Sequence, residues 1–519
     1  MKVSGKIFMK IKVIEGKRIH ECLIKKNIRL DMLLKQIGIL LDMPCGGNHT
    51  CGKCKVRVSG KLSTLTKDER KLLTEDEVKN NIRLACFTKV FGDINIYPNV
   101  DATDTLSMIT LPKYNLTGKG YGLAVDIGTT TVAMQLYDLS TGKMLSEALG
   151  VNAQGSFGAD VISRIQNAAD NGNKYQQDAI QNQLNLMAKD CITQAGVDYI
   201  NKSVITGNTT MLHFYEGLEV KNLATAPFTP TSLFGMKSNH TLVKSPIYLP
   251  KCIGSYIGAD ITCTILATEM IHHSDKIELL ADLGTNGEVV LNIYGKLYCA
   301  STAAGPAFEG ANLTFGMKAG KGAIAKVSIK ANKVFYKTVG NTPAKGICGS
   351  GILDAVSIML ELKIIDETGH IDSEFEGPGK IIYHNEELAW QIPGTKISVT
   401  QKDIRQIQLA KSAIFAGIKT LLKKENLSPE DIDTFYIAGG FGHYMNRHSA
   451  ANIGLFPKEL EDRIKLIGNG ALSGAATLLL DTDQRVNEKS IISKSKEIEL
   501  SGNPTFSEHY VDGMLFSHY

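Results

Sequence analysis

Two short segments of this 519-residue chain repeat each other, and the repeat limits what most of the chain can fold into. Val125–Thr130 reads Val-Asp-Ile-Gly-Thr-Thr, and Ala281–Asn286 reads Ala-Asp-Leu-Gly-Thr-Asn, with Asp282 following Asp126 by 156 residues. In each copy an apolar run leads into the motif and another leaves it, at 121–125 and 131–137 and again at 277–281 and 288–294. This pattern predicts two hairpins, each with Asp-x-Gly-Thr at its bend.

The residue types in these two loops suit a phosphate and a hydrated metal ion. Glycine lets the backbone approach a phosphate, successive amides and hydroxyls can donate to its oxygens, and an aspartate can hold hydrated Mg²⁺. Asp126 and Asp282 are the candidate metal-holding catalytic residues, although aspartates at such positions could instead only stabilise a turn. The candidate phosphate contacts are Gly128, Thr129, Thr130, Gly284, Thr285 and Asn286.

A third glycine-rich segment lies near residue 440. The run 434–438 reads as a buried strand that enters Gly439-Gly440-Phe441-Gly442. Residues without side chains there would let an adenine and ribose lie against the backbone, and an ordinary strand end is the alternative. Taken with the two earlier motifs, the segment predicts that Gly439, Gly440 and Gly442 border an adenosine.

Three further features are weaker candidates for the same site. Gly349-Ser350-Gly351 is expected to be a helix N-terminus that faces nucleotide or substrate, and helix capping alone explains it equally well. Glu288 and Glu309 are candidate water-positioning groups, with a solvated or salt-bridged glutamate as the alternative.

The three motifs, in this order, resemble the two phosphate loops and the adenosine loop of the actin, sugar-kinase and Hsp70-like ATPases. The resemblance implies an α/β fold of two lobes with ATP and Mg²⁺ in the cleft between them. It also implies that Asp126 and Asp282 hold Mg²⁺ through water, while Thr129, Thr130, Thr285 and Asn286 contact phosphates.

Four cysteines near the amino-terminal end point to a redox centre. Cys45, Cys51 and Cys54 share one glycine-rich loop, and Cys86 stands 32 residues further on. A [2Fe–2S] cluster needs four thiolates, and the plant-type C-x4-C-x2-C…C spacing differs from this one by a single residue in the first gap. Cys51-x2-Cys54 could be half of a zinc site, but zinc sites usually pair two short spacings. We therefore expect Cys45, Cys51, Cys54 and Cys86 to ligate a [2Fe–2S] cluster, with His49 as an exposed loop residue.

The segments around these cysteines are expected to form a small domain. Residues 7–14, 18–25, 55–58 and 93–97 read as strands, 30–38 as a helix, and Thr66 to Glu69 as a capping box. Such a unit resembles the β-grasp ferredoxin, with the larger cluster loop of the adrenodoxin-like variant. The expected organisation is α/β and multidomain: a ferredoxin-like domain at 1–100, a linker at 101–118, and an actin-like ATPase at 119–519. Within the ATPase, lobe I is expected at about 119–275, lobe II at about 276–470, and a C-terminal return and tail at 471–519.

Several phrases narrow the resemblance further. They are Thr206-Gly-Asn-Thr-Thr-Met211, the segments 300–310, 346–351 and 403–411, and Gly468-Asn-Gly-Ala-Leu472. Behind a ferredoxin domain, they look like the reductive activators of corrinoid proteins. The resemblance implies ATP-dependent reduction of an inactive Co(II) corrinoid to Co(I) in an anaerobic methyltransferase system. It implies as partners the corrinoid protein and an external low-potential electron donor, and a homodimer is possible.

Other functions stay open at this point. The chain could be an ATP-driven electron donor to another low-potential enzyme, of the acyl-CoA dehydratase type, although those activators typically hold a [4Fe–4S] cluster between subunits. It could be a small-molecule kinase with a regulatory cluster, which would form a phosphorylated product. It could also be a binding module that senses redox state without turning over.

Composition sets broader limits. The net charge of +4 is small for this length, so nucleic acid is not an expected partner. The longest apolar stretch, 346–365, carries three charged residues, which favours a buried helix over a membrane span. A labile cluster and unpaired thiols fit a reducing cytoplasm. The other cysteines are expected to be small buried apolar side chains: Cys22, Cys191, Cys252, Cys263, Cys299 and Cys348.

Overall fold

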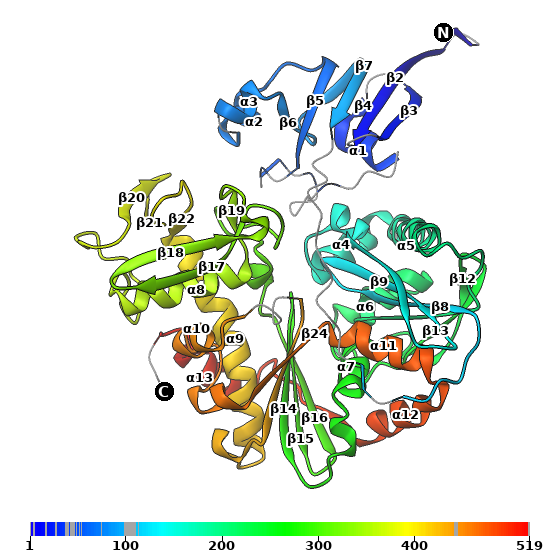
Figure 1. The fold of residues 1–519 in the computed structure, drawn as a ribbon, viewed down its shortest axis with the longest axis vertical. Coiled ribbons are helices and arrows are strands. Elements are labelled where there is room, and N and C mark those ends of the chain that lie inside the picture. Colours follow the sequence, from blue (N-terminus) through cyan, green and yellow to red (C-terminus); the bar gives the residue numbers. More distant parts are fainter. Residues whose placement is uncertain are drawn as a thin grey trace.

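The computed structural model describes residues 2–3, 6–15, 18–25, 28–36, 41, 47, 49–50, 52, 54–73, 75–97, 111–112, 114–440 and 445–516. Figure 1 shows a small amino-terminal domain above two larger lobes that lie on either side of a central division. Most of the expected linker, residues 101–110 and 113, lies outside the described part of the chain.

The amino-terminal domain is built on a seven-stranded sheet. Its main path runs β1-β2-β7-β5-β6, with β3 paired to β2 and β4 paired to β7. Its buried core comes from alternate strand positions and from helix α1, because successive side chains on a strand point to opposite faces. The elements are β1 Lys2–Val3, β2 Lys6–Glu15, β3 Arg18–Lys25, β4 Ile28–Arg29, α1 Leu30–Gln36, β5 Lys55–Leu62, α2 Lys67–Lys71, α3 Glu75–Lys79, β6 Ile82–Leu84 and β7 Lys89–Tyr97.

Most elements expected in this domain are confirmed. The strands expected at 7–14 and 18–25 are β2 and β3, and the expected helix is α1. The strands expected at 55–58 and 93–97 are longer, because β5 continues to Leu62 and β7 already begins at Lys89.

The capping box expected at Thr66 is wrong in one half. The Thr66 side chain accepts a hydrogen bond from the Glu69 amide and so caps α2. The Glu69 carboxylate, however, is fully buried and accepts from the Arg83 guanidinium and the Leu84 amide. A buried carboxylate needs such charged and backbone donors, so Glu69 joins α2 to β6 instead of capping its own helix.

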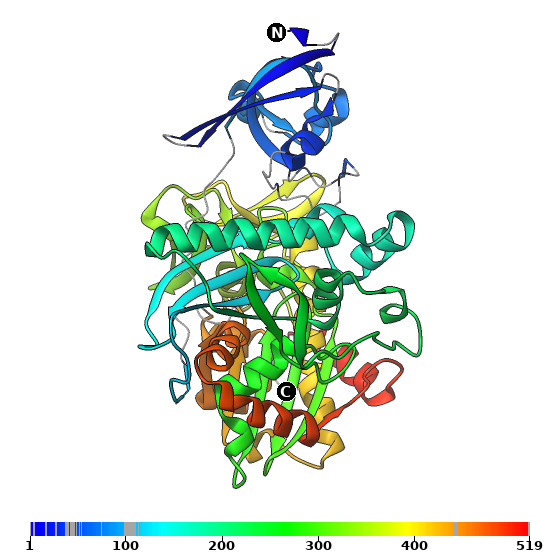
Figure 2. The ribbon, with the colours of Figure 1, turned by 90° about the vertical axis from the view of Figure 1, so that its right-hand side faces the viewer.

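Lobe I is a six-stranded sheet in the order β10-β9-β8-β11-β13-β12. Figure 2 shows the long helix α5 crossing one side of this lobe, and α5 contacts β9 and β10. The elements are β8 Tyr121–Ile127, β9 Thr131–Asp138, β10 Met144–Val151, α4 Val161–Asn171, α5 Lys174–Ala195, β11 Lys202–Gly207, α6 Thr209–Glu216, β12 Met236–Leu242, β13 Ser245–Leu249 and α7 Ala259–Thr268.

Lobe II contains a second six-stranded sheet, β24-β23-β14-β15-β16-β25, and two smaller three-stranded sheets. The large sheet consists of β14 Ile277–Leu283, β15 Gly287–Ile293, β16 Lys296–Thr302, β23 Thr434–Ala438, β24 Ile464–Gly468 and β25 Ser495–Glu497. The small sheets are β17 Ala323–Lys330, β18 Lys333–Thr338 and β19 Gly346–Ile347, and β20 Lys380–His384, β21 Glu387–Gln391 and β22 Ser398–Thr400. The helices are α8 Gly349–Glu361, α9 Gln401–Lys424, α10 Arg447–Asn452, α11 Gly470–Leu480, α12 Arg485–Lys494 and α13 Pro504–Asp512.

The two large sheets share one topology around the repeated motif. In lobe I, β8 pairs antiparallel with β9 and parallel with β11; in lobe II, β14 pairs antiparallel with β15 and parallel with β23. The two hairpins and the strand at 434–438 are thereby confirmed. Because the carboxyl ends of parallel strands meet at one edge of a sheet, each lobe presents its motif beside the end of a second strand.

A shared core joins the lobes beneath these edges. One buried cluster contains Ala124 and Ile261 of lobe I together with Leu280 and Tyr436 of lobe II. Helix α11 follows β24 of lobe II but packs on α7 and β8 of lobe I. The two lobes are therefore joined by packed side chains at this base. Of the helices in the described ranges, none is long and apolar enough to cross a membrane.

Candidate functional site

Two of the four expected cluster ligands lie side by side. The Sγ atoms of Cys54 and Cys86 are 3.3 Å apart, and both side chains are buried. Pairing of β5 with β6 brings these distant residues together, since Lys55 lies opposite Leu84 and the Ala85 amide donates to the Cys54 carbonyl. Thiolates this close can ligate one iron, so the pair fits a [2Fe–2S] cluster. Cys45 and Cys51 lie outside the described residues.

His49, between the first two cysteines, is exposed as expected but is also held in place. Its Nε2 atom lies 2.9 Å from the Cys86 carbonyl oxygen, and its ring centroid lies 4.3 Å from that of Phe87. These contacts fasten the cysteine loop to the segment that carries Cys86. Of the remaining cysteines, Cys191, Cys252, Cys263, Cys299 and Cys348 are buried, as expected, while the side chain of Cys22 is not among those described.

A cavity of about 450 Å³ lies where the two repeated motifs face each other. Most of the described residues that the sequence nominated for the nucleotide site line it: Asp126, Gly128, Thr129, Thr130, Asp282, Gly284, Thr285, Asn286, Glu288, Glu309, Gly349, Ser350, Gly439 and Gly440. Gly351 does not line it and packs against the Ile324 carbonyl. Gly442 lies outside the described residues. The volume of the cavity falls within the range of small-molecule binding sites. Segments more than 300 residues apart in sequence therefore line one space.

Three polar side chains that sequence reasoning missed hold the first phosphate loop. Asn152 donates to the Gly128 carbonyl at 2.7 Å, Arg164 donates to the Thr129 carbonyl at 2.6 Å, and Asn208 donates to the Thr129 hydroxyl at 3.0 Å. Side chains thereby engage two carbonyls of the loop, and the Gly128 amide donates to the Thr131 carbonyl, so these contacts fix the conformation of the loop. Arg164 is almost completely buried, and burial lowers the pKa of its guanidinium to about 10.

The two phosphate loops also touch each other across the cleft. The Thr130 hydroxyl lies 3.1 Å from the Thr285 hydroxyl, which donates to Glu309 at 2.9 Å. Lys318 of lobe II reaches the Thr131 hydroxyl of lobe I at 3.5 Å. A phosphate that accepts hydrogen bonds from both threonines must enter this contact, so a bound nucleotide would change how the two lobes meet.

The cleft gathers buried carboxyl groups whose ionisation is disfavoured. Burial raises the pKa of Asp126 to about 6, against the opposing effect of a hydrogen bond from Asn469. Burial and the neighbouring charges of Asp126 and Glu309 raise the pKa of Asp282 to about 7.

Two further carboxyls strengthen this effect. Burial and the neighbouring charges of Asp126 and Asp282 raise the pKa of Asp260 to about 8. Burial and the neighbouring charges of Asp260 and Asp282 raise the pKa of Glu288 well above its usual range. Glu288 is buried rather than solvated. A cation would be needed to ionise such a group at neutral pH. Among the described residues, no group of three His, Cys, Asp or Glu side chains is arranged to hold a metal ion directly.

The third glycine-rich segment and the start of α8 lie at another part of the cavity wall. Gly439 has φ +98°, and a Cβ atom there would lie 2.5 Å from the Leu283 carbonyl oxygen. Only glycine fits at this close approach. Gly349 and Ser350 begin α8, which confirms the expected helix N-terminus, and its N-cap residue Cys348 supplies no side-chain hydrogen bond. The Ser350 hydroxyl donates to the Ala325 carbonyl and is thereby already engaged within the protein.

A second cavity, of about 480 Å³, relates the cysteine loop to this cleft. Thr50, one residue before Cys51, lines it together with Thr130, Glu309 and Lys318, which also line the first cavity. Thr50 therefore lies next to the cleft that the two repeated motifs line.

Three family models match successive parts of the chain. A family model described as a 2Fe-2S iron-sulfur cluster binding domain matches residues 13–91, one described as the RACo middle region matches 121–273, and one described as the C-terminal domain of RACo, the ASKHA domain, matches 276–519. The corrinoid activation enzyme RamQ of Eubacterium limosum is 36% identical over 419 residues, which cover 76% of this chain and 70% of RamQ. The chain belongs to the RACo family of corrinoid activators.

One further relative and one solved structure are similar to most of the chain. The [Co(II) methylated amine-specific corrinoid protein] reductase of Methanosarcina barkeri is 25% identical, covering 75% of this chain and 76% of that protein. A solved structure, the reductive activator for corrinoid, iron-sulfur protein, is 30% identical with a TM-score of 0.71, and the match covers 98% of each chain. The ferredoxin-like domain and the ASKHA fold expected from the motifs are therefore confirmed.

Two of the cleft residues that the sequence analysis missed could have been found from their local sequence. Asn208 and Asn469 each follow a strand directly and cap the next helix, and both lie in phrases already singled out, Thr206–Met211 and Gly468–Leu472. Asp260 and Arg164 carried none, because each lies within an ordinary helix and reaches the cleft only through packing.

Proposed function

We propose that this protein uses Mg-ATP binding and hydrolysis to reduce the Co(II) corrinoid of a partner protein to Co(I), one electron at a time. The observation that carries the proposal is that one chain contains both the neighbouring thiols of Cys54 and Cys86 and a cleft built from two Asp-x-Gly-Thr loops. Cys54 and Cys86, with Cys45 and Cys51, would hold the [2Fe–2S] cluster. When bound, this cluster supplies single electrons at low potential.

In the cleft, the chain's own residues bind and orient the nucleotide. Asp126 and Asp282 would hold hydrated Mg²⁺, and Glu288 or Glu309 would position the attacking water. Arg164 holds the first phosphate loop, and Gly439 and Gly440 would border the adenosine.

The physical reason to join the two sites is energetic. For one electron, a shortfall of about 100 mV against a very low-potential acceptor corresponds to about 2.3 kcal/mol. Coupling energies of about 1–3 kcal/mol between sites are ordinary in proteins that change conformation. Closure of the lobes on ATP could therefore favour a form of the partner that accepts the electron. The Thr130–Thr285 contact and the position of Thr50 support such coupling.

The partner is proposed to be a corrinoid protein of a methyltransferase system, by analogy with the methylated-amine corrinoid protein named for the Methanosarcina relative. An external low-potential donor would return the protein to its reduced form.

The test mixes the reduced holoprotein, Mg-ATP and a Co(II) corrinoid protein under anaerobic conditions. We expect the visible spectrum of Co(I) to appear only when ATP is present, and Cys54→Ser to abolish it. An ATP analogue that cannot be hydrolysed separates the effect of binding from that of hydrolysis. Formation of ADP and a phosphorylated metabolite without Co(I) would instead indicate a kinase.

A further inference from the structure

The small net charge of the whole chain conceals a strong asymmetry. Residues 1–100 contain 20 lysines and arginines against 10 aspartates and glutamates, a net charge of +10. The other 419 residues contain 37 against 43, a net charge of −6. The domain that carries the cysteine loop is therefore strongly basic, while the ATPase part is acidic. Charge asymmetry of this size is a physical argument about binding partners.

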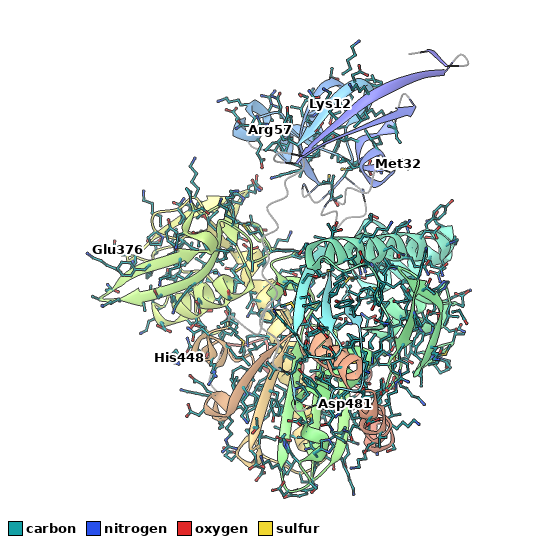
Figure 3. All side chains as sticks on the ribbon, turned by 45° about the vertical axis from the view of Figure 1, so that its right-hand side comes forward. Lys12, Met32, Arg57, Glu376, His448 and Asp481 are labelled. Carbon is teal, nitrogen blue, oxygen red and sulfur yellow. The ribbon has the colours of Figure 1, made fainter. Side chains whose placement is uncertain are left out.

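Part of the positive charge is collected on two neighbouring strands. Arg57 and Lys61 of β5 and Lys89 of β7 are exposed, and we call these three residues the basic ridge. Lys61 lies against Gly92 of β7, and the Arg57 guanidinium lies 5.3 Å from the ring centroid of Tyr97. Figure 3 labels Arg57 at one end of this domain. Among the residues that the structure describes, none of the three forms an ion pair.

Part of the acidic side chains of the same domain is engaged. Four of its carboxylates form ion pairs within the domain, in the pairs Arg29–Asp31, Lys55–Glu77, Lys71–Asp68 and Arg83–Glu69. They neutralise basic residues away from the basic ridge, so the ridge keeps its charge.

The basic ridge begins close to the expected cluster. Arg57 is the third residue after Cys54 on an extended strand, a separation of roughly 10 Å at about 3.3 Å per residue. Phe91, on β7 between Lys89 and Tyr97, is 44% exposed. Along the exposed face of β7, Phe91 lies between Lys89 and Asp93, and Asp93 accepts a hydrogen bond from the Lys10 amide. An exposed aromatic side chain near exposed cations has the composition of a small, charge-steered docking surface.

We infer that the basic ridge is the docking surface for a small acidic electron-carrier protein that reduces the cluster. The inference rests on the proposed function and identifies the chemical class of its external donor. In each encounter the carrier would be oxidised by one electron and the cluster reduced by one. Opposite charges would speed the encounter of a transient complex, in which a small interface must form and separate at every turnover.

The experiment compares two triple variants of the full-length holoprotein with the wild type. The ridge variant reverses the charge of the three residues of the basic ridge. The control variant reverses the charge of three exposed cations on helices α2 and α3 of the same domain, so that the net charge of both variants falls by six units. The substitutions are Arg57→Glu, Lys61→Glu and Lys89→Glu in the ridge variant, and Lys67→Glu, Arg70→Glu and Lys79→Glu in the control variant. The probe is an acidic plant-type ferredoxin. Two quantities are measured: its dissociation constant when oxidised, and, by stopped flow, the rate at which its reduced form reduces the cluster.

For the wild type, we expect affinity and rate to fall about tenfold or more between 20 and 300 mM salt, because salt screens exposed charges. At low salt the ridge variant should bind and react at least about tenfold more weakly than the control variant. Cluster content and photoreduction by a deazaflavin should be unchanged in both. Equal losses in the two variants, or no loss in either, would refute the ridge as the docking surface.

Two other results would also overturn the inference. The ridge variant could keep its ferredoxin reaction but lose affinity for the Co(II) corrinoid protein, which would assign the ridge to that partner. Wild-type affinity could also be independent of salt, which would remove electrostatic steering. In all these cases, ATP-dependent Co(I) formation by deazaflavin-reduced wild type tests the proposed function separately.

Discussion

Replacing Asn469 by serine should move the pH dependence of nucleotide binding to higher pH. Asn469 has two separate roles: its side-chain oxygen accepts from the Leu472 amide and caps α11, while its side-chain nitrogen donates to Asp126 at 2.9 Å. Serine is also a good N-cap residue, so Asn469→Ser should keep the cap and lose only the bond to Asp126.

The size of the effect follows from that bond. A hydrogen bond to a charged group is worth about 1.5–3 kcal/mol, which equals roughly 1–2 pKa units. Loss of the bond should therefore raise the pKa of Asp126 from about 6 to roughly 7–8. At pH 7 the ionised fraction of Asp126 would fall from about nine-tenths to between about a half and a tenth. Because Mg²⁺ binds the ionised form, the apparent affinity for Mg-ATP should fall about two- to ninefold at pH 7 and recover near pH 9.

The assay measures the dissociation constant of Mg-ATP from pH 5.5 to 9 for the wild type, Asn469→Ser and Asn503→Ser. Asn503 caps α13 by the same kind of bond, far from the cleft, so its serine variant controls for the loss of an asparagine cap. The reasoning is refuted if Asn469→Ser weakens binding equally at every pH, or if its profile coincides with that of the control.

Three other changes have defined outcomes. Cys54→Ser or Cys86→Ser should remove iron and visible absorbance while ATP binding persists, since the thiolates lie outside the cleft; a retained spectrum would contradict their assignment as ligands. Arg164→Met should raise the KM for ATP more than it changes kcat, because the Thr129 carbonyl loses its donor at a cost of about 1–3 kcal/mol. An unchanged KM would count against this. So would a failure of Arg164→Gln, which restores a donor, to recover ATP binding. Lys411 is buried, donates to the Gly513 and Leu515 carbonyls, and has its pKa lowered to about 7 by burial. Between about pH 7 and 10 the unfolded chain therefore binds one proton more than the folded chain, so the free energy of unfolding should rise with pH in that window. Lys411→Met should flatten this rise in thermal denaturation and speed proteolysis of the tail. A pH dependence of the variant parallel to that of the wild type would show that Lys411 does not titrate there.

Much of the fold was predictable because its signals are local. The hairpins around 126 and 282 depend on runs of strand-forming residues that meet at a glycine turn, and both formed as expected. Glu69 shows where local reasoning fails. Its position suits a capping box, but a partly buried arginine from a later strand competes for the same carboxylate and binds it. Tertiary contacts override a local preference whenever burial would otherwise leave a charge unpaired.

By itself, the sequence determined which chemical groups are present and in what order: the cysteine spacing and the three glycine-rich motifs. These are short-range patterns, since a loop of a few residues takes its conformation from its own backbone. Only the tertiary structure decided that Cys86 lies 3.3 Å from Cys54, that Asp260 joins Asp126 and Asp282, and that Arg164 reaches the first phosphate loop. Such contacts arise from strand pairing and helix packing, which place residues far apart in the chain at the same edge of a sheet, and no spacing in the sequence records them.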